Sequence, residues 1–275
     1  MRTVGRGRTS VKLRSPLLTE RSRSTSFFPQ HGSFVNREKR REGMHPTDKA
    51  ARVAGAVYLS MAVTAPFSLI YIPRALIVRA DATATANNIL AHETLFRLGI
   101  VADLITSVIF VFLVMALYRL LSGVNKEHAS MMVALVLVSA TVGFMNVLNN
   151  IAALTLLRGA DFLAVFERPH RDALAMLFLR LHGQGLVINE IFSGLWLFPF
   201  GVLVMRSRFL PRLLGLWLIV NGFAYLALSF TGLLLPQYYD FAFRSASPAL
   251  FGEMAIMLWL LIKGAKEQTV NVPAS

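Results

Sequence analysis

Long apolar runs separated by short polar connections occupy most of the chain, from Ala50 to about Lys263. A helix needs roughly 20 apolar residues to cross the hydrocarbon core of a bilayer, and several of these runs reach that length. The pattern predicts six membrane-spanning helices, at about 51–72, 98–121, 131–157, 184–205, 213–235 and 247–262, of which the last is the shortest. The predicted fold class is therefore all-α, a polytopic transmembrane helix bundle.

Prolines and polar residues predict where these helices bend and end. Pro66 lies inside the first span, where the lost backbone hydrogen bond should kink the helix, and Pro73 is expected to close that span. In the connection that follows, Asp81 is placed to cap a short surface helix. Pro236 is expected to end the fifth span.

The charged segment 158–180, between the third and fourth spans, contains one apolar stripe. Leu174, Leu177, Phe178 and Leu181 follow the spacing of a single helical face. The stripe is consistent with an interfacial helix and equally with the first turns of a long fourth helix. The sequence leaves both interpretations open.

Residues 1–49 differ from the rest of the chain because they are rich in Arg, Ser, Gly and Pro and lack apolar periodicity. They carry 12 Lys and Arg against 4 Asp and Glu, a net +8 of the chain's +13. We interpret them as a disordered basic tail, followed by a transmembrane domain at 50–266 and a short C-terminal tail at 267–275. Alternatively, the natural start is Met44, and the basic tail is then an artefact of gene calling.

Composition agrees with a membrane protein and narrows the partners. Of the 275 residues, 55% are hydrophobic and only 16% charged, against about 25% charged in soluble domains. No cysteine is present, so disulfides, thiolate catalysis and cysteine metal sites are excluded. The basic tail carries no nucleic-acid recognition motif. We therefore expect it to contact anionic lipid headgroups of the bilayer and not nucleic acid.

The orientation in the membrane follows from charge. An even number of spans places both termini on one side, and Lys and Arg concentrate on the cytoplasmic side of membrane proteins. The basic tail and the dense turn from Arg206 to Arg212 favour cytoplasmic termini. We predict a multi-pass protein of the bacterial inner membrane with both ends in the cytoplasm.

Polar side chains inside the predicted spans are the candidates for function, because an Asp at the centre of a span costs about 2.5–3.5 kcal/mol on insertion scales. In the predicted topology most of them lie in the outer half of the membrane. We predict that they line one outward-facing polar pocket, formed by Asp103, Asn146, Asn150, His182, Asn189, Glu190 and Glu253. The alternative is that the amides only hold helices together, a common role of Asn and Gln between spans.

Glu190 is the strongest single candidate, since a carboxyl in the middle of a span needs a partner or a proton. We expect it to face the bundle interior, within reach of Asp103, Asn146, Asn150, Asn221 or Glu253. Metal and cofactor sites are not expected, because the histidines show neither HxxxH nor HExxH spacing.

Several short blocks together resemble a known family. They are Ala54-Gly55-Ala56-Val57-Tyr58-Leu59, Ala65-Pro66-Phe67-Ser68, Leu95-Phe96-Arg97-Leu98-Gly99-Ile100, Leu181-His182-Gly183 and Leu195-Trp196-Leu197-Phe198-Pro199-Phe200-Gly201. The chain resembles, over about 50–266, the bacterial integral membrane family called domain of unknown function 4386. The resemblance implies a multi-span bacterial membrane protein with no established activity, and it supplies no catalytic residues.

Three functions from different classes fit the sequence. The first is binding or transport of a small polar or amphiphilic molecule, with the carboxyls coupling to protons. The second is a membrane-embedded enzyme with Glu190 or Asp103 as the base and His182 as the acid. The third is an accessory subunit, for which Glu190→Gln and Asp103→Asn would leave the phenotype intact. The absence of a recognisable catalytic motif favours a role other than catalysis.

Overall fold

The computed structural model describes residues 46–265, and these are helical with no strand among them. The expectations for residues 1–45, for the start at Met44 and for the C-terminal tail 267–275 lie outside the described residues. The first helix begins at Pro46, inside the segment assigned to the tail from sequence. The helices, in chain order, are α1 Pro46–Pro66, the π-helix η1 Phe67–Tyr71, α2 Ile72–Leu76, α3 Ala82–Ala91, α4 Glu93–Leu121, α5 Lys126–Arg158, the 3-10 helix η2 Asp161–Leu163, α6 Arg168–Leu195, α7 Leu197–Arg206, α8 Arg212–Leu234, the 3-10 helix η3 Pro236–Tyr238 and α9 Tyr239–Ile262.

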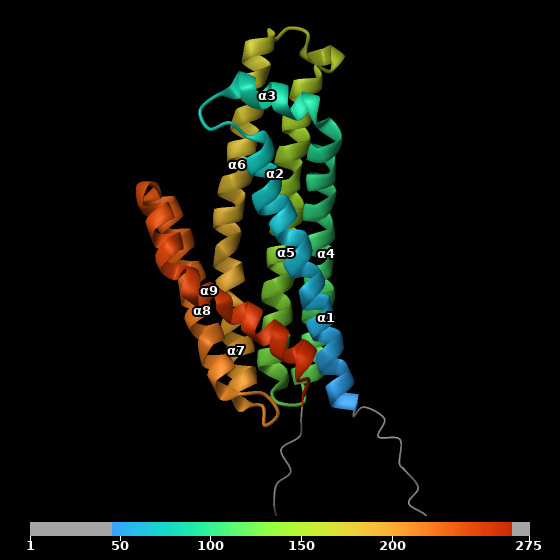
Figure 1. Cartoon of the computed structure of the whole chain (residues 1–275), viewed down its shortest axis with the longest axis vertical. Helices are drawn as coiled ribbons and strands as arrows, with labels where there is room; N and C mark the ends of the chain where they lie inside the picture. The colour runs from blue at the N-terminus through green and yellow to red at the C-terminus, as the bar shows by residue number, and fades with distance from the viewer. Residues whose placement is uncertain (1–45, 266–275) are drawn as a thin grey trace, which may run out of the picture. The chain divides into compact units, whose positions relative to one another are not determined.

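Six helical segments are long and apolar enough to cross a membrane, as the sequence predicted. They are α1 with η1 and α2, α4, α5, α6 with α7, α8, and α9 with η3. The start of α1 and the end of α9 lie at the same end of this helical bundle, and α3 lies across the opposite end (Figure 1). An even number of spans requires this placement of the two ends.

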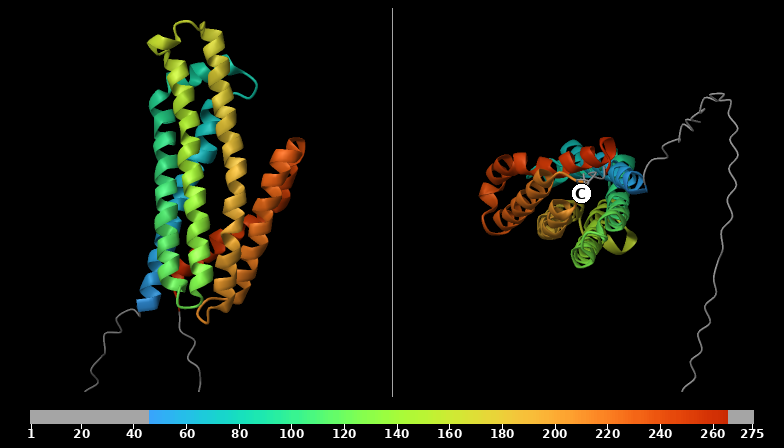
Figure 2. Two further views of the ribbon diagram at one scale, coloured as in Figure 1. Left: turned by 180° about the vertical axis from the view of Figure 1, so that it is seen from behind. Right: turned by 90° about the horizontal axis from the view of Figure 1, so that it is seen from below.

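The spans form a closed ring of contacts. Going around it, α1 packs against α4, α4 against α5, α5 against α6, α6 and α7 against α8, α8 against α9, and α9 back against α1. Figure 2 shows α8 and α9 tilting away from α6 toward the end that carries α3. Because the ring closes, side chains that point inward from all six spans can meet.

The first span differs from the prediction at its prolines. After Pro66 the α-helix passes into the π-helical turn η1, because a proline nitrogen cannot donate the next backbone hydrogen bond. Pro73 does not close the span, contrary to expectation. It sits in the first turn of α2, where a missing N–H is tolerated, and the span ends at Leu76, after which Ile77 is extended.

The short surface helix predicted after the first span is confirmed as α3. The Ala84 N–H donates to Asp81 Oδ1 over 2.8 Å, which satisfies one of the free amides at the start of the helix. The fifth span also ends as predicted, at Leu234, just before Pro236.

The apolar stripe in segment 158–180 belongs to the first turns of a long fourth helix, since α6 runs without interruption from Arg168 to Leu195. The stripe lies at the boundary between protein and surroundings. Leu177 and Leu181 are exposed, whereas Leu174 and Phe178 are partly buried and pack against a buried cluster that includes Leu179. The stripe therefore located the helix and only part of its buried side.

The sixth span is longer than predicted. It begins at Tyr239 instead of 247 and continues through Pro248, and α8 is the shorter helix. The first two turns of α9 contain the charged residues Asp240 and Arg244, which the prediction placed outside the span. Charged residues at the end of a span can reach the headgroup region, so they are compatible with a helix there.

Two apolar clusters pack between the helices, one with residues from all six spans and the other at the end of the bundle that carries α3. One surrounds Trp196, Phe200 and Leu117, and the other surrounds Ile89 and Phe96. Along α4, α5 and α6, the polar residues predicted to form the pocket fall between the segments that supply these two clusters. The fold therefore places them at a polar level between two apolar ones.

Candidate functional site

A cavity of about 230 Å³ lies inside the ring of spans. Its lining comes from all six spans and includes five of the seven residues predicted for the pocket. Those five are Asp103, Asn146, His182, Asn189 and Glu253. Asn150 and Glu190 do not line it.

The depth of these residues follows from their positions along the helices. Asp103 lies ten residues into α4, and His182 and Glu253 lie fourteen residues into α6 and α9. Because α4 has 29 residues and the span formed by α6 and α7 has 39, Asp103 and His182 lie about a third of the way along their spans, whereas Glu253 lies just past the middle of the 24 residues of α9. That the pocket lies in the outer half of the membrane stays a prediction.

A carboxylate and an imidazole face each other at one side of the cavity. Asp103 Oδ2 lies 3.7 Å from His182 Nε2, and both side chains are largely buried, with 12% and 14% of their surface exposed. Ser107, one turn along α4, donates its hydroxyl to the Asp103 backbone carbonyl over 3.1 Å. The cavity is therefore lined on this side by two groups that can exchange a proton, a carboxyl group and an imidazole.

Amides of α5 position His182. Its Nδ1 lies 3.2 Å from the Asn146 backbone carbonyl, and the Asn146 Nδ2 donates to the His182 backbone carbonyl over 2.9 Å. A carbonyl oxygen only accepts, so His182 carries its proton on Nδ1 when this bond is made. The other nitrogen, Nε2, then lies between the Asn150 amide at 3.4 Å and Asp103. It can accept from the amide when the ring is neutral and donate to the carboxylate when the ring is charged.

A missing side chain makes room for this arrangement. A Cβ on Gly185 of α6 would collide with the amide oxygen of Asn146. The small residue therefore lets Asn146 lie against α6 and reach His182 one turn away. A Cβ added to Gly183, by contrast, would have no neighbouring atom within 4 Å.

The second carboxyl group of the cavity comes from the opposite side of the ring. Glu253 on α9 accepts a hydrogen bond from the Tyr58 hydroxyl of α1, and the Asn221 amide of α8 donates to its other oxygen over 3.4 Å. Tyr225 of α8 also lines the cavity. Glu253 therefore links α9 to α1 and α8 by hydrogen bonds and also lines the cavity.

Glu190 lies apart from the other candidates. Its Oε1 accepts from the Tyr239 hydroxyl of α9 over 2.7 Å, and its Oε2 is buried with no hydrogen-bond partner among the described residues. The partner found is thus Tyr239, not one of the carboxyl or amide residues expected from sequence. Asn189, the neighbouring residue, turns into the cavity and accepts from Ser139 over 3.0 Å.

Sequence reasoning missed the tyrosines Tyr58, Tyr225 and Tyr239. Tyrosines of membrane proteins concentrate at the headgroup level. Tyr58 and Tyr225 lie inside predicted spans instead, and this unusual position could have marked them as partners of the buried polar residues. Tyr239 was missed because it lay outside the predicted sixth span. In the part of the chain that the structure describes, no three His, Cys, Asp or Glu side chains are grouped to hold a metal ion.

Comparison with protein families identifies a relationship. The model of a family described as Domain of unknown function (DUF4386) matches residues 53–264, which include every residue of the cavity and all of the six spans except the start of the first, which begins at Thr47. No curated protein and no solved structure matches the chain.

Proposed function

The chain belongs to this family of unknown function, and we propose from the geometry of its cavity that it binds a small polar molecule inside the membrane. The ligand is a cation or a hydrogen-bond donor. The observation that carries the proposal is the lining itself, in which two carboxyl groups, Asp103 and Glu253, face a space to which residues 46–265 contribute no Lys or Arg.

The remaining lining supports the same ligand class. The carboxyl and amide oxygens of Asp103, Asn189 and Glu253 are acceptors, and Ser and Thr hydroxyls add adaptable partners. At about 230 Å³ the cavity is smaller than the 300–1,000 Å³ typical of drug-sized ligands. A molecule of a few heavy atoms with an ammonium or hydroxyl group fits these limits.

Transport coupled to protons is the extension that we favour. A bound cation would compete with a proton for Asp103, and His182 offers a place for the displaced proton. Ionisable residues inside spans recur in the proton relays of pumps and transporters. The ring of spans would then have to open on alternate sides of the membrane.

Ligand binding is tested by thermal unfolding of the purified protein in detergent, with ethanolamine, choline, glycerol or acetate added. A ligand that binds only the folded state raises its melting temperature, so we expect ethanolamine or choline, as cations, or glycerol, as a neutral hydrogen-bond donor, to stabilise the wild type and acetate to have no effect. Asp103→Asn should abolish the shift, whereas Glu127→Gln, at an exposed position of α5, should retain it. The proposal fails if neither the two cations nor glycerol stabilise the wild type, or if Asp103→Asn responds as the wild type does.

A membrane-embedded enzyme is the second candidate, favoured by the distance of 3.7 Å between Asp103 and His182. A general acid and base must lie within reach of the proton that they transfer. The two candidates differ in outcome: an enzyme converts its ligand, which mass spectrometry of the incubated amine detects, and a carrier returns it unchanged.

For the location, we propose the bacterial inner membrane with both termini in the cytoplasm. The end of the bundle where α1 starts and α9 ends carries the basic turn between Arg206 and Arg212, and basic loops favour the cytoplasmic side. A basic N-terminal segment there would contact anionic lipid headgroups. A reporter fused after Ser275 should be active in the cytoplasm, and one inserted after Ala164 should be active in the periplasm. The opposite pair of signals would overturn this orientation.

A further inference from the structure

A second hollow lies between α4 and α5, near the end of the bundle that carries α3, and shares no residue with the cavity described above. Its volume is about 560 Å³. Its walls are largely apolar, formed by Ile100 and Val101 of α4 and by Ile151 and Leu154 of α5. Val101 and Ile151 are 47% and 44% exposed on the faces of apolar spans, so this groove opens toward lipid. We call it the α4–α5 groove.

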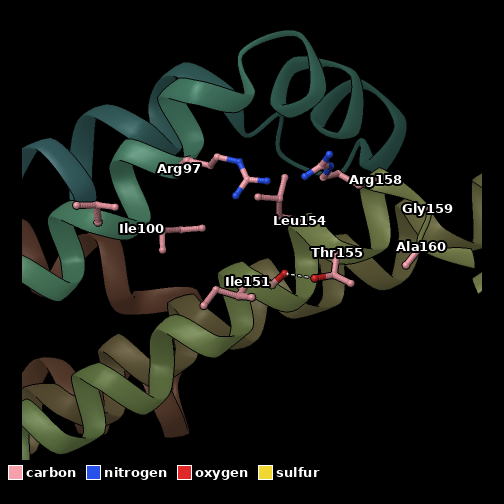
Figure 3. Close-up of a pocket in the computed structure, with 9 residues that line it drawn as sticks. Arg97, Ile100, Ile151, Leu154, Thr155, Arg158, Gly159 and Ala160 are labelled. Atoms are coloured by element: carbon pink, nitrogen blue, oxygen red, sulfur yellow. Dashed lines mark hydrogen bonds between the residues drawn. The ribbon is translucent and has the colours of Figure 1, made fainter. Parts of the chain in front are cut away.

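Two arginines stand at the groove. Figure 3 shows the guanidinium groups of Arg97 and Arg158 extending toward each other beside the Leu154 side chain. Both approach the same oxygen, since Glu93 Oε1 lies 2.7 Å from Arg97 Nε and 3.7 Å from Arg158 Nη1. The two guanidinium groups and the one carboxylate leave a net charge of +1 at this point.

Most of the guanidinium donors are available. Among residues 46–265, no hydrogen bond is made by any nitrogen of Arg158 or by the two Nη atoms of Arg97. The side chains are 59% and 48% exposed, and exposed ion pairs contribute only about 0.2–1 kcal/mol. An anion with several oxygens would therefore gain new partners from both arginines without displacing a strong pair.

The position of the groove along the spans indicates which class of anion binds there. Arg158 is the last residue of α5, and Arg97 lies one turn after the start of α4, so both are at the level where a spanning helix leaves the hydrocarbon for the headgroups. The planar guanidinium fork matches phosphate oxygens, and the apolar walls below match an acyl chain. From this combination we propose that the α4–α5 groove binds an anionic phospholipid, with its phosphate between Arg97 and Arg158 and an acyl chain along the groove.

The test compares lipid retention by full-length protein in native mass spectrometry. Wild-type protein in detergent receives phosphatidylglycerol or phosphatidylcholine, and we expect it to retain the first in preference. Arg97→Gln with Arg158→Gln should weaken phosphatidylglycerol binding by about tenfold, because charge-assisted hydrogen bonds are lost. Arg79→Gln with Arg244→Gln removes the same charge from exposed positions elsewhere and should bind as the wild type does.

Two further variants keep the outcome interpretable. Arg97→Lys with Arg158→Lys retains the charge without the fork and should give an intermediate affinity, which a general loss of folding would not. Ile151→Trp fills the groove and should weaken retention of both lipids while the arginines stay in place.

The proposal is overturned if the double Gln variant retains phosphatidylglycerol as the wild type does. It is also overturned if glycerol phosphate displaces the lipid and Ile151→Trp leaves lipid retention unchanged. These two results together would show that the ligand of the arginines is a soluble phosphate compound and not a lipid. A dimer that the double Gln variant loses, without any lipid adduct in the wild type, would assign the groove to a second copy of the chain.

Discussion

Replacing Glu253 with alanine is expected to lower the stability of the protein more than any other single change in the cavity, by about 2–4 kcal/mol. The substitution leaves the Tyr58 hydroxyl and the Asn221 amide without their acceptor, and Asn221 is fully buried. Tyr58 is also buried, and a buried donor left without an acceptor costs about 1–3 kcal/mol. Thermal unfolding in detergent, followed by circular dichroism, should show a clearly lower melting temperature.

Glu253→Gln separates the structural role of this residue from its charge. The amide oxygen of glutamine still accepts from Tyr58, and its NH2 can donate to the Asn221 amide oxygen, which has no partner among the described residues. We therefore expect a loss of less than about 1 kcal/mol, together with a loss of the stabilisation by amines. Glu127→Ala, on the exposed side of α5, should stay within about 0.5 kcal/mol of the wild type. If Glu253→Ala has the same melting temperature as the wild type, the contacts of Glu253 with α1 and α8 do not hold the ring closed.

The second large effect is expected at Gly55, where α1 lies against the backbone of α9. A Cβ on this residue would lie 2.5 Å from the Leu261 nitrogen, 2.8 Å from its Cα and 2.9 Å from the Leu260 carbonyl carbon. All three are backbone atoms, which cannot turn aside as a flexible side chain can. Gly55→Val should therefore push the two helices apart, at a cost of about 3 kcal/mol, and open the ring of spans.

The measurements for Gly55 are the yield of monodisperse protein and its melting temperature. Gly183→Ala is the matched control, because nothing lies within 4 Å of a Cβ there and alanine favours a helix over glycine by about 1 kcal/mol. It should leave the protein unchanged or slightly more stable. Equal behaviour of the two variants would show that α1 and α9 can be separated without consequence.

The spans could be predicted because their signal is a property of the residues alone. Each must be apolar over the thickness of a bilayer and must satisfy its backbone hydrogen bonds internally. Helix ends were less accurate because charged and proline residues are tolerated in terminal turns. Thus Tyr239 begins α9 eight residues before the predicted start, and Pro73 lies within the first span instead of closing it.

Part of the candidate site was also visible in the sequence. Polar residues are costly in a span unless they have partners, so Asp103, His182 and Glu253 stood out without a structure, and all three line the cavity. Sequence could not assign the partners, because these depend on how each helix is rotated. Asn189 and Glu190 are adjacent on α6, yet only Asn189 lines the cavity, while Glu190 binds Tyr239.

Hydropathy and helix length depend on local composition, so the solvent, the class of fold, the set of six spans and the family resemblance could all be inferred without coordinates. The closure of the spans into a ring, with α9 returning to α1 at Gly55, could not. That closure brings Glu253 across to Tyr58, 195 positions away in the chain. Such contacts depend on helix rotation and on the few small residues that permit close approach, and no periodicity along one helix carries this information.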